Sequence, residues 1–408
     1  MQAYERLIRY AVYPTASDAA SDTCPTTPEQ LDFARDLEKE LGELGLCEIS
    51  LDENGYLFAT IPATAGCEDA PVIGFIAHMD VVRDVEFRGV KPQIVHYTGG
   101  DVVIGGRTVL AASENGELKN YIGKTLITSD GTTLLGADDK AGIAVILTAA
   151  ERLLAGDMPH GKIRIGFTPD EEIGRGADLF DVEKFGAAWA YTLDGGAFGE
   201  VEYETFNAAS LDVRVTGKSF HPGSSKDRMV NAALVAMEYA AMLPALERPE
   251  HTEGYQGFYH LTNMSGRVAD ASLSYILRDH DAALLEAKKA HARRAADLLN
   301  RRYGEGTVAV TITDSYRNMR EAIEPEMHLI ENAREAIRAA GGEPWSAPVR
   351  GGTDGSRLSF MGLPCPNLGT GAHNAHGVAE YAVAEEMEQC VAQLLELARR
   401  YGMHKQVQ

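Results

Sequence analysis

The stretch APVIGFIAHMD, residues 70–80, carries a continuous apolar run that ends in a histidine and an aspartate. A run of this kind is typical of a strand buried on both faces at the centre of a parallel sheet. His78 and Asp80 stand two positions apart, so their side chains share one face of the extended chain. The pair either closes a buried strand or belongs to a site in which Asp80 accepts a hydrogen bond from the ring nitrogen of His78 that does not bind a metal.

Strand-like and helical segments alternate in the chain beyond this stretch. Strand-like runs occur in TLITSDG (125–131), GKIRIGFTPDEE (161–172) and AAWAYTLDGG (187–196), and between them lie the helical segment 139–156 and the helix-compatible segment 176–185. This alternation predicts an α/β domain in which all these strands belong to one mixed, mostly parallel sheet with helices on both faces.

A surface helix is predicted over residues 27–45. Thr27 is expected as the N-cap, Pro28 as the first helical residue and Gln30 as the third, which is the arrangement of a capping box. Leucine and alanine residues then recur at helical intervals.

The order of elements changes after about residue 205. Strand, helix, strands, helix and strand follow one another, an order that suits a small α+β sandwich, and from about Pro325 the α/β pattern returns. We therefore expect a discontinuous α/β domain formed by residues 1–205 and 322–408, with an α+β domain inserted at residues 206–321.

The composition is that of a globular protein of two domains, with 408 residues, 45% of them hydrophobic and 24% charged. The formal net charge of −22 repels phosphate backbones and anionic lipids. Because of this charge, nucleic acid and membrane are not expected as partners. The sequence also has neither a membrane-spanning run of about 18 apolar residues nor the apolar core of a signal peptide, so the cytoplasm is the expected compartment. The five cysteines are far apart and form no C-x-x-C pair, so neither a disulfide framework nor a thiolate zinc site is expected.

Acidic residues and histidines occur at or near the ends of the predicted strands and at the start of the predicted helix 139–156. In open parallel sheets, sites form beyond the carboxyl ends of the strands. Each residue also has an ordinary explanation, as a helix cap, an acidic turn, an Asp-Gly turn or a solvated loop histidine. Together they supply the nitrogen and oxygen ligands that a pair of catalytic zinc ions needs. The residues are His78, Asp138, Asp139, Glu171, Glu172, Asp194, His373 and His376.

Glu171 and Glu172 are adjacent at the end of one predicted strand. Successive residues of an extended chain point in opposite directions. One glutamate can therefore hold a metal ion while the other faces a bound water molecule, and the residues alone leave open which is which.

Seven motifs stand in the order and spacing of one known group of enzymes. They are AHMD, LLGADDKAGIA, FTPDEEIGRGAD, YTLDGG, HPGSSKDRMVNA, RGGTDGSRLSFMGLPCPNLGTG and HNAHG. From about residue 5 to residue 400 the chain resembles the tripeptide aminopeptidases among the dinuclear zinc metallopeptidases related to glutamate carboxypeptidase. The resemblance implies an enzyme of peptide catabolism that removes the amino-terminal residue from tripeptides. It also implies that the inserted domain is of the lid or dimerisation type and would form the contact in any homodimer.

The resemblance further implies two zinc ions per chain, with cobalt or manganese able to replace them, and a hydroxide that bridges them. One ion is held by His78, Asp138 and Asp194, and the other by Asp138, Glu172 and His376.

Two of these ligands are selected by their neighbours in the motifs. The resemblance implies Asp138 and not Asp139, because the bridging aspartate of these relatives stands two residues before a lysine, here Lys140. It likewise implies His376 and not His373, because the histidine ligand of these relatives precedes a glycine.

The remaining roles come from the resemblance and from the chemistry of a short peptide. The resemblance implies that Glu171 is the general base, that Asp80 orients His78, and that His221 of the inserted domain stabilises the oxyanion. In several relatives this histidine comes from the partner subunit.

The carboxylate of a tripeptide calls for an arginine, which can donate two parallel hydrogen bonds to it. Arg278 and Arg350 are the candidates, and Asn207 is a weaker one for a polar contact with the substrate. Either arginine could instead form an ordinary surface ion pair.

Two other functions compete with this interpretation. A related dinuclear zinc dipeptidase or N-acyl-amino-acid deacylase would use the same ligands. A non-catalytic metal-binding or assembly protein would also keep them, but it would have no need of Glu171 beside a ligand.

Overall fold

The computed structural model describes residues 1–403, apart from the side chain of Arg107. The chain divides into two units, which are described separately. The first consists of Met1–Tyr203, Glu321–Ala347 and the chain from Thr353 onward, and the second of Glu204–Arg320 and Pro348–Gly352. Residues 348–352, expected from the sequence in the first domain, thus group with the second unit.

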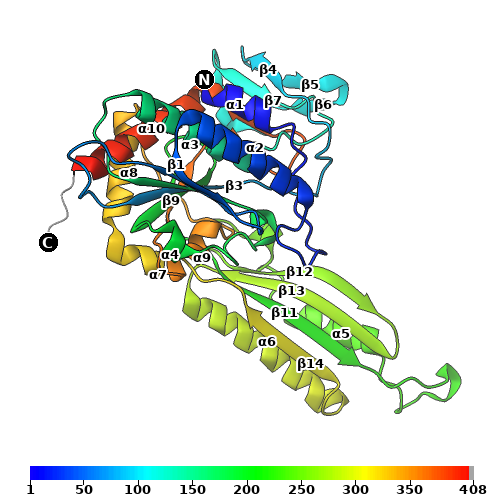
Figure 1. Cartoon of the computed structure of the whole chain (residues 1–408). Helices are drawn as coiled ribbons and strands as arrows, with labels where there is room; N and C mark the ends of the chain where they lie inside the picture. The colour runs from blue at the N-terminus through cyan, green and yellow to red at the C-terminus, as the bar shows by residue number, and fades with distance from the viewer. Residues whose placement is uncertain (404–408) are drawn as a thin grey trace. The chain divides into compact units, whose positions relative to one another are not determined.

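The first unit is built on a seven-stranded mixed sheet (Figure 1). Its four central strands, β8, β3, β9 and β15, run parallel, while β1, β2 and β10 are antiparallel to their neighbours. Every residue of β3 and β8 is buried, as the apolar runs predicted. In spatial order the strands are β1 (Cys47–Leu51), β2 (Leu57–Ile61), β8 (Ile163–Thr168), β3 (Ile73–His78), β9 (Trp189–Gly195), β15 (Asn367–Gly369) and β10 (Val201–Glu202).

Helices cover both faces of this sheet (Figure 1). On one face the almost wholly buried helix α3 packs against β3 and β9 and is itself covered by α1, α2 and α10. On the other face α4 and α9 enclose a cluster that includes Phe58, Phe180 and Leu358. The helices are α1 (Ala3–Tyr10), α2 (Pro28–Leu44), α3 (Ala137–Ala155), α4 (Val182–Phe185), α7 (Arg320–Ile323), α8 (His328–Ala339), α9 (Asp354–Phe360) and α10 (Ala384–Met403). The predicted α/β class is confirmed.

A second sheet of the first unit corrects one prediction. Thr125–Thr128, expected in the main sheet, forms β7 and pairs antiparallel with β17 and β4. An apolar run shows that a strand is buried but not which strand it pairs with, because Leu126 is buried here against another core that contains Tyr381. The other strands are β4 (Gln93–His96), β16 (Ala372–His373) and β17 (Tyr381–Val383), with a separate hairpin of β5 (Val102–Ile104) and β6 (Thr108–Leu110).

The second unit is an α+β sandwich. Its antiparallel sheet has the order β12-β13-β11-β14, and two helices pack on it. Burial alternates along β13, so one face of the sheet forms a core with the helices. The elements are β11 (Asn207–Thr216), α5 (Ala232–Met242), β12 (Phe258–Gly266), β13 (Asp270–Asp279), α6 (Ala282–Tyr303) and β14 (Val308–Asp314).

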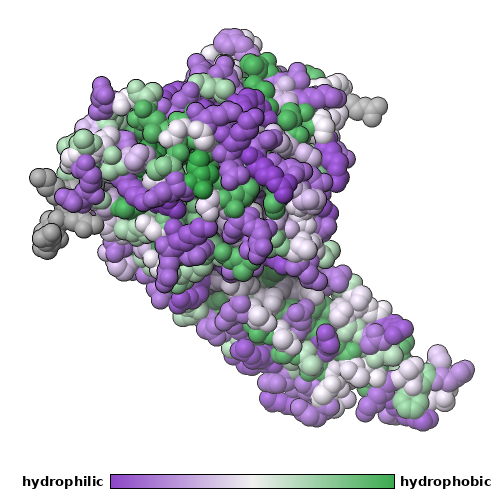
Figure 2. Space-filling view, in the orientation of Figure 1, coloured by the Kyte–Doolittle hydropathy of each residue, from purple (hydrophilic) through white to green (hydrophobic). Residues whose placement is uncertain are grey.

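The surface of the first unit is mixed in character. Hydrophilic residues cover most of the face drawn in Figure 2, and hydrophobic ones gather there in small groups. Among the residues described, no helix is long and apolar enough to cross a membrane.

Candidate metal centre and active site

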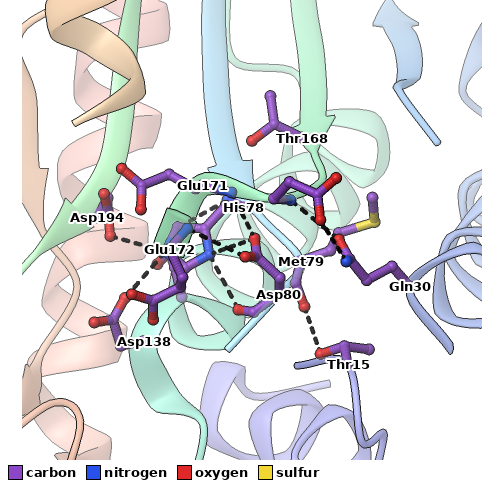
Figure 3. Close-up of polar contacts among 12 residues, drawn as sticks. Thr15, Gln30, His78, Met79, Asp80, Asp138, Thr168, Glu171, Glu172 and Asp194 are labelled. Atoms are coloured by element: carbon purple, nitrogen blue, oxygen red, sulfur yellow. Dashed lines mark hydrogen bonds and ion pairs between the residues drawn. The ribbon is translucent and has the colours of Figure 1, made fainter. Parts of the chain in front are cut away.

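The carboxyl ends of three neighbouring parallel strands bring the predicted side chains together. His78 is the last residue of β3, Glu171 and Glu172 follow β8, and Asp194 stands near the end of β9. Because β8, β3 and β9 are adjacent and parallel, these ends meet at one edge of the sheet. Asp138 joins them from the start of α3, and Figure 3 shows its carboxylate turned toward His78.

Asp138 lies between two histidines, one on each of its carboxylate oxygens. Nε2 of His78 is 3.1 Å from Oδ1 of Asp138 and 3.3 Å from Oδ1 of Asp194. Nε2 of His376 is 3.1 Å from Oδ2 of Asp138 and 3.0 Å from Oε2 of Glu172. The five side chains therefore form two groups of ligand atoms that share one carboxylate.

These two groups fit two divalent cations. In a tetrahedral site with bonds of about 2.0–2.1 Å, neighbouring ligand atoms are about 3.3 Å apart, close to the separations observed. The Oε1 atom of Glu172 is also buried without a hydrogen-bond partner among the described residues. A buried oxygen of that kind calls for a cation or a proton.

Asp139 has a different environment from Asp138. It is fully buried, its Oδ1 accepts from the backbone N–H of Gly142 at 3.1 Å, and its Oδ2 accepts from that of His78 at 3.2 Å. One of its oxygens nevertheless lies within 4.8 Å of ligand atoms of His78 and Asp194. The geometry supports Asp138 as the bridging residue, with Asp139 holding the backbone of the neighbouring strand.

The cluster attracts positive charge strongly. Burial raises the pKa of Glu172 to about 7 and that of Asp194 to about 6. Burial alone would also raise the pKa of Asp138, but hydrogen bonds from His376 and His78 lower it below its usual value. The same bonds to Asp138 and Glu172 raise the pKa of His376 to about 10. The carboxylates thus stabilise any cation that enters the cluster, whether a proton or a metal ion.

Asp80 holds more than the ring of His78. Nδ1 of His78 is 3.1 Å from the backbone oxygen of Asp80 and 3.4 Å from its Oδ1. The Asp80 carboxylate also accepts from the backbone N–H groups of Glu171 at 2.9 Å and Glu172 at 3.1 Å. Asp80 therefore ties the strand end that carries His78 to the turn that carries both glutamates.

The Glu171 carboxyl group has no hydrogen-bond partner among the described residues, although Asp80 holds its backbone. Burial, together with the nearby Asp194 carboxylate, raises the pKa of Glu171 well above its usual value. Its side chain is therefore fixed at the backbone and free at the carboxyl group, as proton transfer to and from a substrate requires.

His373 is held in place away from these ligand atoms. Its Nε2 lies 3.1 Å from Oε2 of Glu386 and 3.2 Å from the hydroxyl of Tyr121, and its ring stacks on Tyr381 at 4.8 Å. Of the two histidines in the loop, His376 is the one that faces Asp138.

Sequence reasoning missed the residues that fix the turn before Glu171. Asp170 has left-handed backbone angles, with φ 58° and ψ 25°. Its carboxylate accepts from the backbone N–H and hydroxyl of Thr26 and from Nε2 of Gln30. The capping box predicted at Gln30 is wrong, because Thr27 forms no side-chain cap and the Gln30 amide faces Asp170 instead.

Glu380 was missed as well. Its buried carboxylate accepts from the backbone N–H groups of Leu135, Gly136 and Asp138 at 2.7 to 3.0 Å. It therefore fixes the loop that presents Asp138. Its place four residues after His376 was the only signal in the sequence.

Asp354, in the motif GGTDG, is a third such residue. It is buried, accepts from the hydroxyl of Thr168 at 2.7 Å, and has a pKa raised to about 7 by burial.

His221 and Arg278 belong to the second unit. His221 is exposed before the short helix Pro222–Ser224, and its Nδ1 accepts from the N–H of Gly223 at 3.2 Å, which leaves Nε2 as the donor. The Arg278 guanidinium lies 5.3 Å from the ring centre of Tyr316 and donates to the Leu277 carbonyl.

Arg350 and Asn207 also belong to the second unit, and both are hydrogen-bonded within it. Arg350 donates to the carbonyls of Gly254 and Gln256 at 2.8 Å and to the hydroxyl of Thr252 at 2.9 Å. The Asn207 amide donates to the carbonyls of Asp279 and His280 and accepts from the N–H of Asn318.

Comparison with known proteins agrees with the fold. The model of peptidase family M20/M25/M40 matches residues 129–400, and the chain belongs to this family of peptide-bond hydrolases. Within it the chain is 53% identical over 402 residues to a protein of Caldanaerobacter subterraneus subsp. tengcongensis named Peptidase T, covering 98% of each sequence. The chain therefore falls in the Peptidase T group of the family.

Solved structures share the fold. A tripeptidase from Staphylococcus aureus superposes with a TM-score of 0.77 at 23% identity, covering 99% of this chain and all of that one. A dinuclear metal-binding peptidase of the M20 family from Bacillus subtilis gives 0.65 at 16% identity, covering 98% of each chain.

Proposed function

We propose that this protein is a tripeptide aminopeptidase that uses two zinc ions. The observation that carries the proposal is Asp138, whose two oxygens face different histidines in a cluster that also holds Glu172 and Asp194. His78, Asp138 and Asp194 would hold one ion, and Asp138, Glu172 and His376 the other. When bound, the ions would activate a water molecule and polarise the scissile carbonyl.

The chain's own side chains move the protons. Glu171 accepts a proton from the attacking water and delivers it to the leaving amine. Asp80 keeps Glu171 in place through the backbone bond at 2.9 Å. Glu380 and Asp139 hold the segments that carry Asp138 and His78 through their backbone bonds. A rigid surround of this kind keeps the reacting groups at productive distances.

We also propose roles for three residues of the second unit. His221 would stabilise the oxyanion through its Nε2 proton. Arg278 would bind the carboxylate of the tripeptide, and it is favoured over Arg350, which already donates three hydrogen bonds within its own unit. Asn207 remains the weakest candidate, because its amide is fully used by backbone groups.

We also propose a homodimer formed through the second unit. Strand β12 is an edge strand that is exposed along most of its length, and the neighbouring helix α5 exposes Leu234 and Met237 to 57% and 58%. An open edge beside exposed apolar side chains is typical of a contact between subunits. A cytoplasmic location and a role in peptide catabolism complete the proposal.

The function can be tested by release of the amino-terminal residue from matched di-, tri- and tetrapeptides, with and without added zinc. We expect the tripeptide to be cleaved fastest and zinc to restore the activity of chelator-treated protein. Preferential cleavage of the dipeptide or of N-acyl amino acids would support the dipeptidase or deacylase alternative instead.

A further inference from the structure

A cavity of about 370 Å³ lies beside the proposed metal ligands in the first unit. Its walls include Asp138 and Asp194, and also Glu200, Trp345 and His373. A peptide bond placed against the ligands would therefore have one of its neighbouring residues in this cavity.

Glu200 is the one acidic residue of the cavity wall that the proposed mechanism leaves without a role. Its side chain is 8% exposed, and its Oε2 accepts from the backbone N–H of Gly196 at 2.9 Å. Gly196 stands two residues after Asp194, so the Glu200 carboxyl group lies close to the proposed metal centre.

The Glu200 carboxyl group has fewer donors than its burial demands. A carboxylate offers about four acceptor positions, and Glu380, which is also buried, receives three backbone N–H groups. Glu200 receives one backbone N–H group, and its other hydrogen-bond partner is the carboxyl group of Glu202, which can donate only while it is protonated. No lysine, arginine or histidine of residues 1–403 lies within ion-pair distance of either acid, although the charge of His373, on the same cavity wall, acts to lower the pKa of Glu200.

Glu202 places a second buried carboxyl group beside that of Glu200. It accepts from Nδ2 of Asn367 at 2.7 Å, and burial, with Glu200 beside it, raises its pKa well above the usual value. Burial likewise raises the pKa of Glu200. Two adjacent buried acids are costly unless a proton or a cation reaches them.

We infer that Glu200 binds the α-ammonium group of the substrate's first residue. The inference rests on the proposed function, under which that residue lies beside the metal centre with its amino group uncapped. An ammonium group has three N–H donors, and the Glu200 carboxylate receives only one backbone N–H group. The ammonium group would also provide the positively charged partner within hydrogen-bond distance that the Glu200 carboxylate lacks. Glu200 would thus decide that the free amino end, and not an acylated or internal residue, occupies the cavity.

The test compares a tripeptide with its desamino analogue, in which hydrogen replaces the α-amino group, on wild type and Glu200→Gln. Glutamine keeps the shape and the bond from Gly196 but carries no charge. We expect kcat/KM for the tripeptide to fall about tenfold to a hundredfold in the variant, while the rate with the desamino analogue is unchanged. Glu200→Asp keeps the negative charge but moves it away from the cavity by one methylene group. Its kcat/KM for the tripeptide should lie between those of wild type and Glu200→Gln.

Glu202→Gln is the matched control. It removes the neighbouring acid but leaves the cavity wall intact, so it should keep the preference for the free amine. Metal content and Tm are measured for each variant. The assignment of Glu200 would be overturned if wild type and Glu200→Gln preferred the tripeptide over its desamino analogue equally. It would also be overturned if only Glu202→Gln lost this preference. In both cases the peptidase activity itself would stand. Wild type that cleaves no tripeptide would overturn the proposed function, and the assignment with it.

Discussion

Gln30 and Asp170 hold each other through two hydrogen bonds. The backbone N–H of Asp170 donates to Oε1 of Gln30 at 3.1 Å, and Nε2 of Gln30 donates back to Oδ1 of Asp170 at 2.7 Å. Both residues are buried. The first turn of α2 thereby fixes the left-handed residue that directly precedes the proposed general base.

Gln30→Glu tests this relationship. A carboxylate cannot donate to Asp170, so the turn should lose its brace and Glu171 its fixed position. We expect a lower Tm, corresponding to about 1–3 kcal/mol, and a lower kcat with a smaller change in KM. Lys39→Gln, an exposed change on the same helix, is the control. Unchanged kcat and Tm in Gln30→Glu would show that the brace is dispensable.

Glu171→Gln and Glu172→Gln should separate the base from the ligand. Glu171→Gln should keep its metal and lose about 10²- to 10⁴-fold in turnover, because an amide cannot accept the proton. Glu172→Gln should instead bind metal more weakly. Parallel metal analysis and kinetics check both variants, and an exchange of these two behaviours would reverse the assignments.

Arg278→Ala should raise KM for a tripeptide far more than for the same peptide with an amidated carboxyl end. A hydrogen-bonded charged carboxylate contributes about 1.5–3 kcal/mol, roughly a tenfold to hundredfold effect, and an amide has no such charge to lose. Arg350→Ala is the comparison, because its guanidinium bonds suggest a structural role. If KM rises equally for the free and the amidated peptide in both variants, neither arginine recognises the carboxylate.

The raised pKa of Glu202 predicts a pH-dependent stability. Because its folded-state pKa lies above its unfolded value of about 4.3, its contribution to stability is fully present below that pH and is lost as the pH rises toward the folded pKa. Glu202→Gln removes this loss. Relative to wild type, the variant should therefore gain stability as pH rises above about 4.5, by up to about 1.4 kcal/mol per pH unit. Denaturant unfolding across pH checks this, and a constant difference would contradict it.

The sequence predicted the central strands well because burial on both faces leaves a plain apolar run. The run before His78 shows this for β3. The apolar pattern could not assign Thr125–Thr128 to the right sheet, because strand pairing depends on residues far away in the sequence, here Tyr381–Val383. Local pattern also failed at Gln30, where a tertiary bond to Asp170 replaced the local cap.

Most of the ligand candidates were accessible from sequence because they are polar residues at or near a strand or helix end, while His376 stands in a glycine-flanked loop of one of the motifs. Their supports were not. Glu380 lies in a loop and Glu200 in a single β-bridge before the short strand β10, and burial of such isolated residues leaves no periodic signal in the sequence.

The most direct test of the two-metal centre is the metal content of wild type and Asp138→Asn, measured by elemental analysis on protein loaded with zinc and freed of excess. An amide cannot present two equivalent anionic oxygens, so Asp138 is the one residue whose change should affect both ions. We expect two ions per chain in wild type, fewer than two in the variant, and loss of activity with the metal. Full peptidase activity in wild type that holds no metal, or two tightly bound ions in Asp138→Asn, would contradict the account.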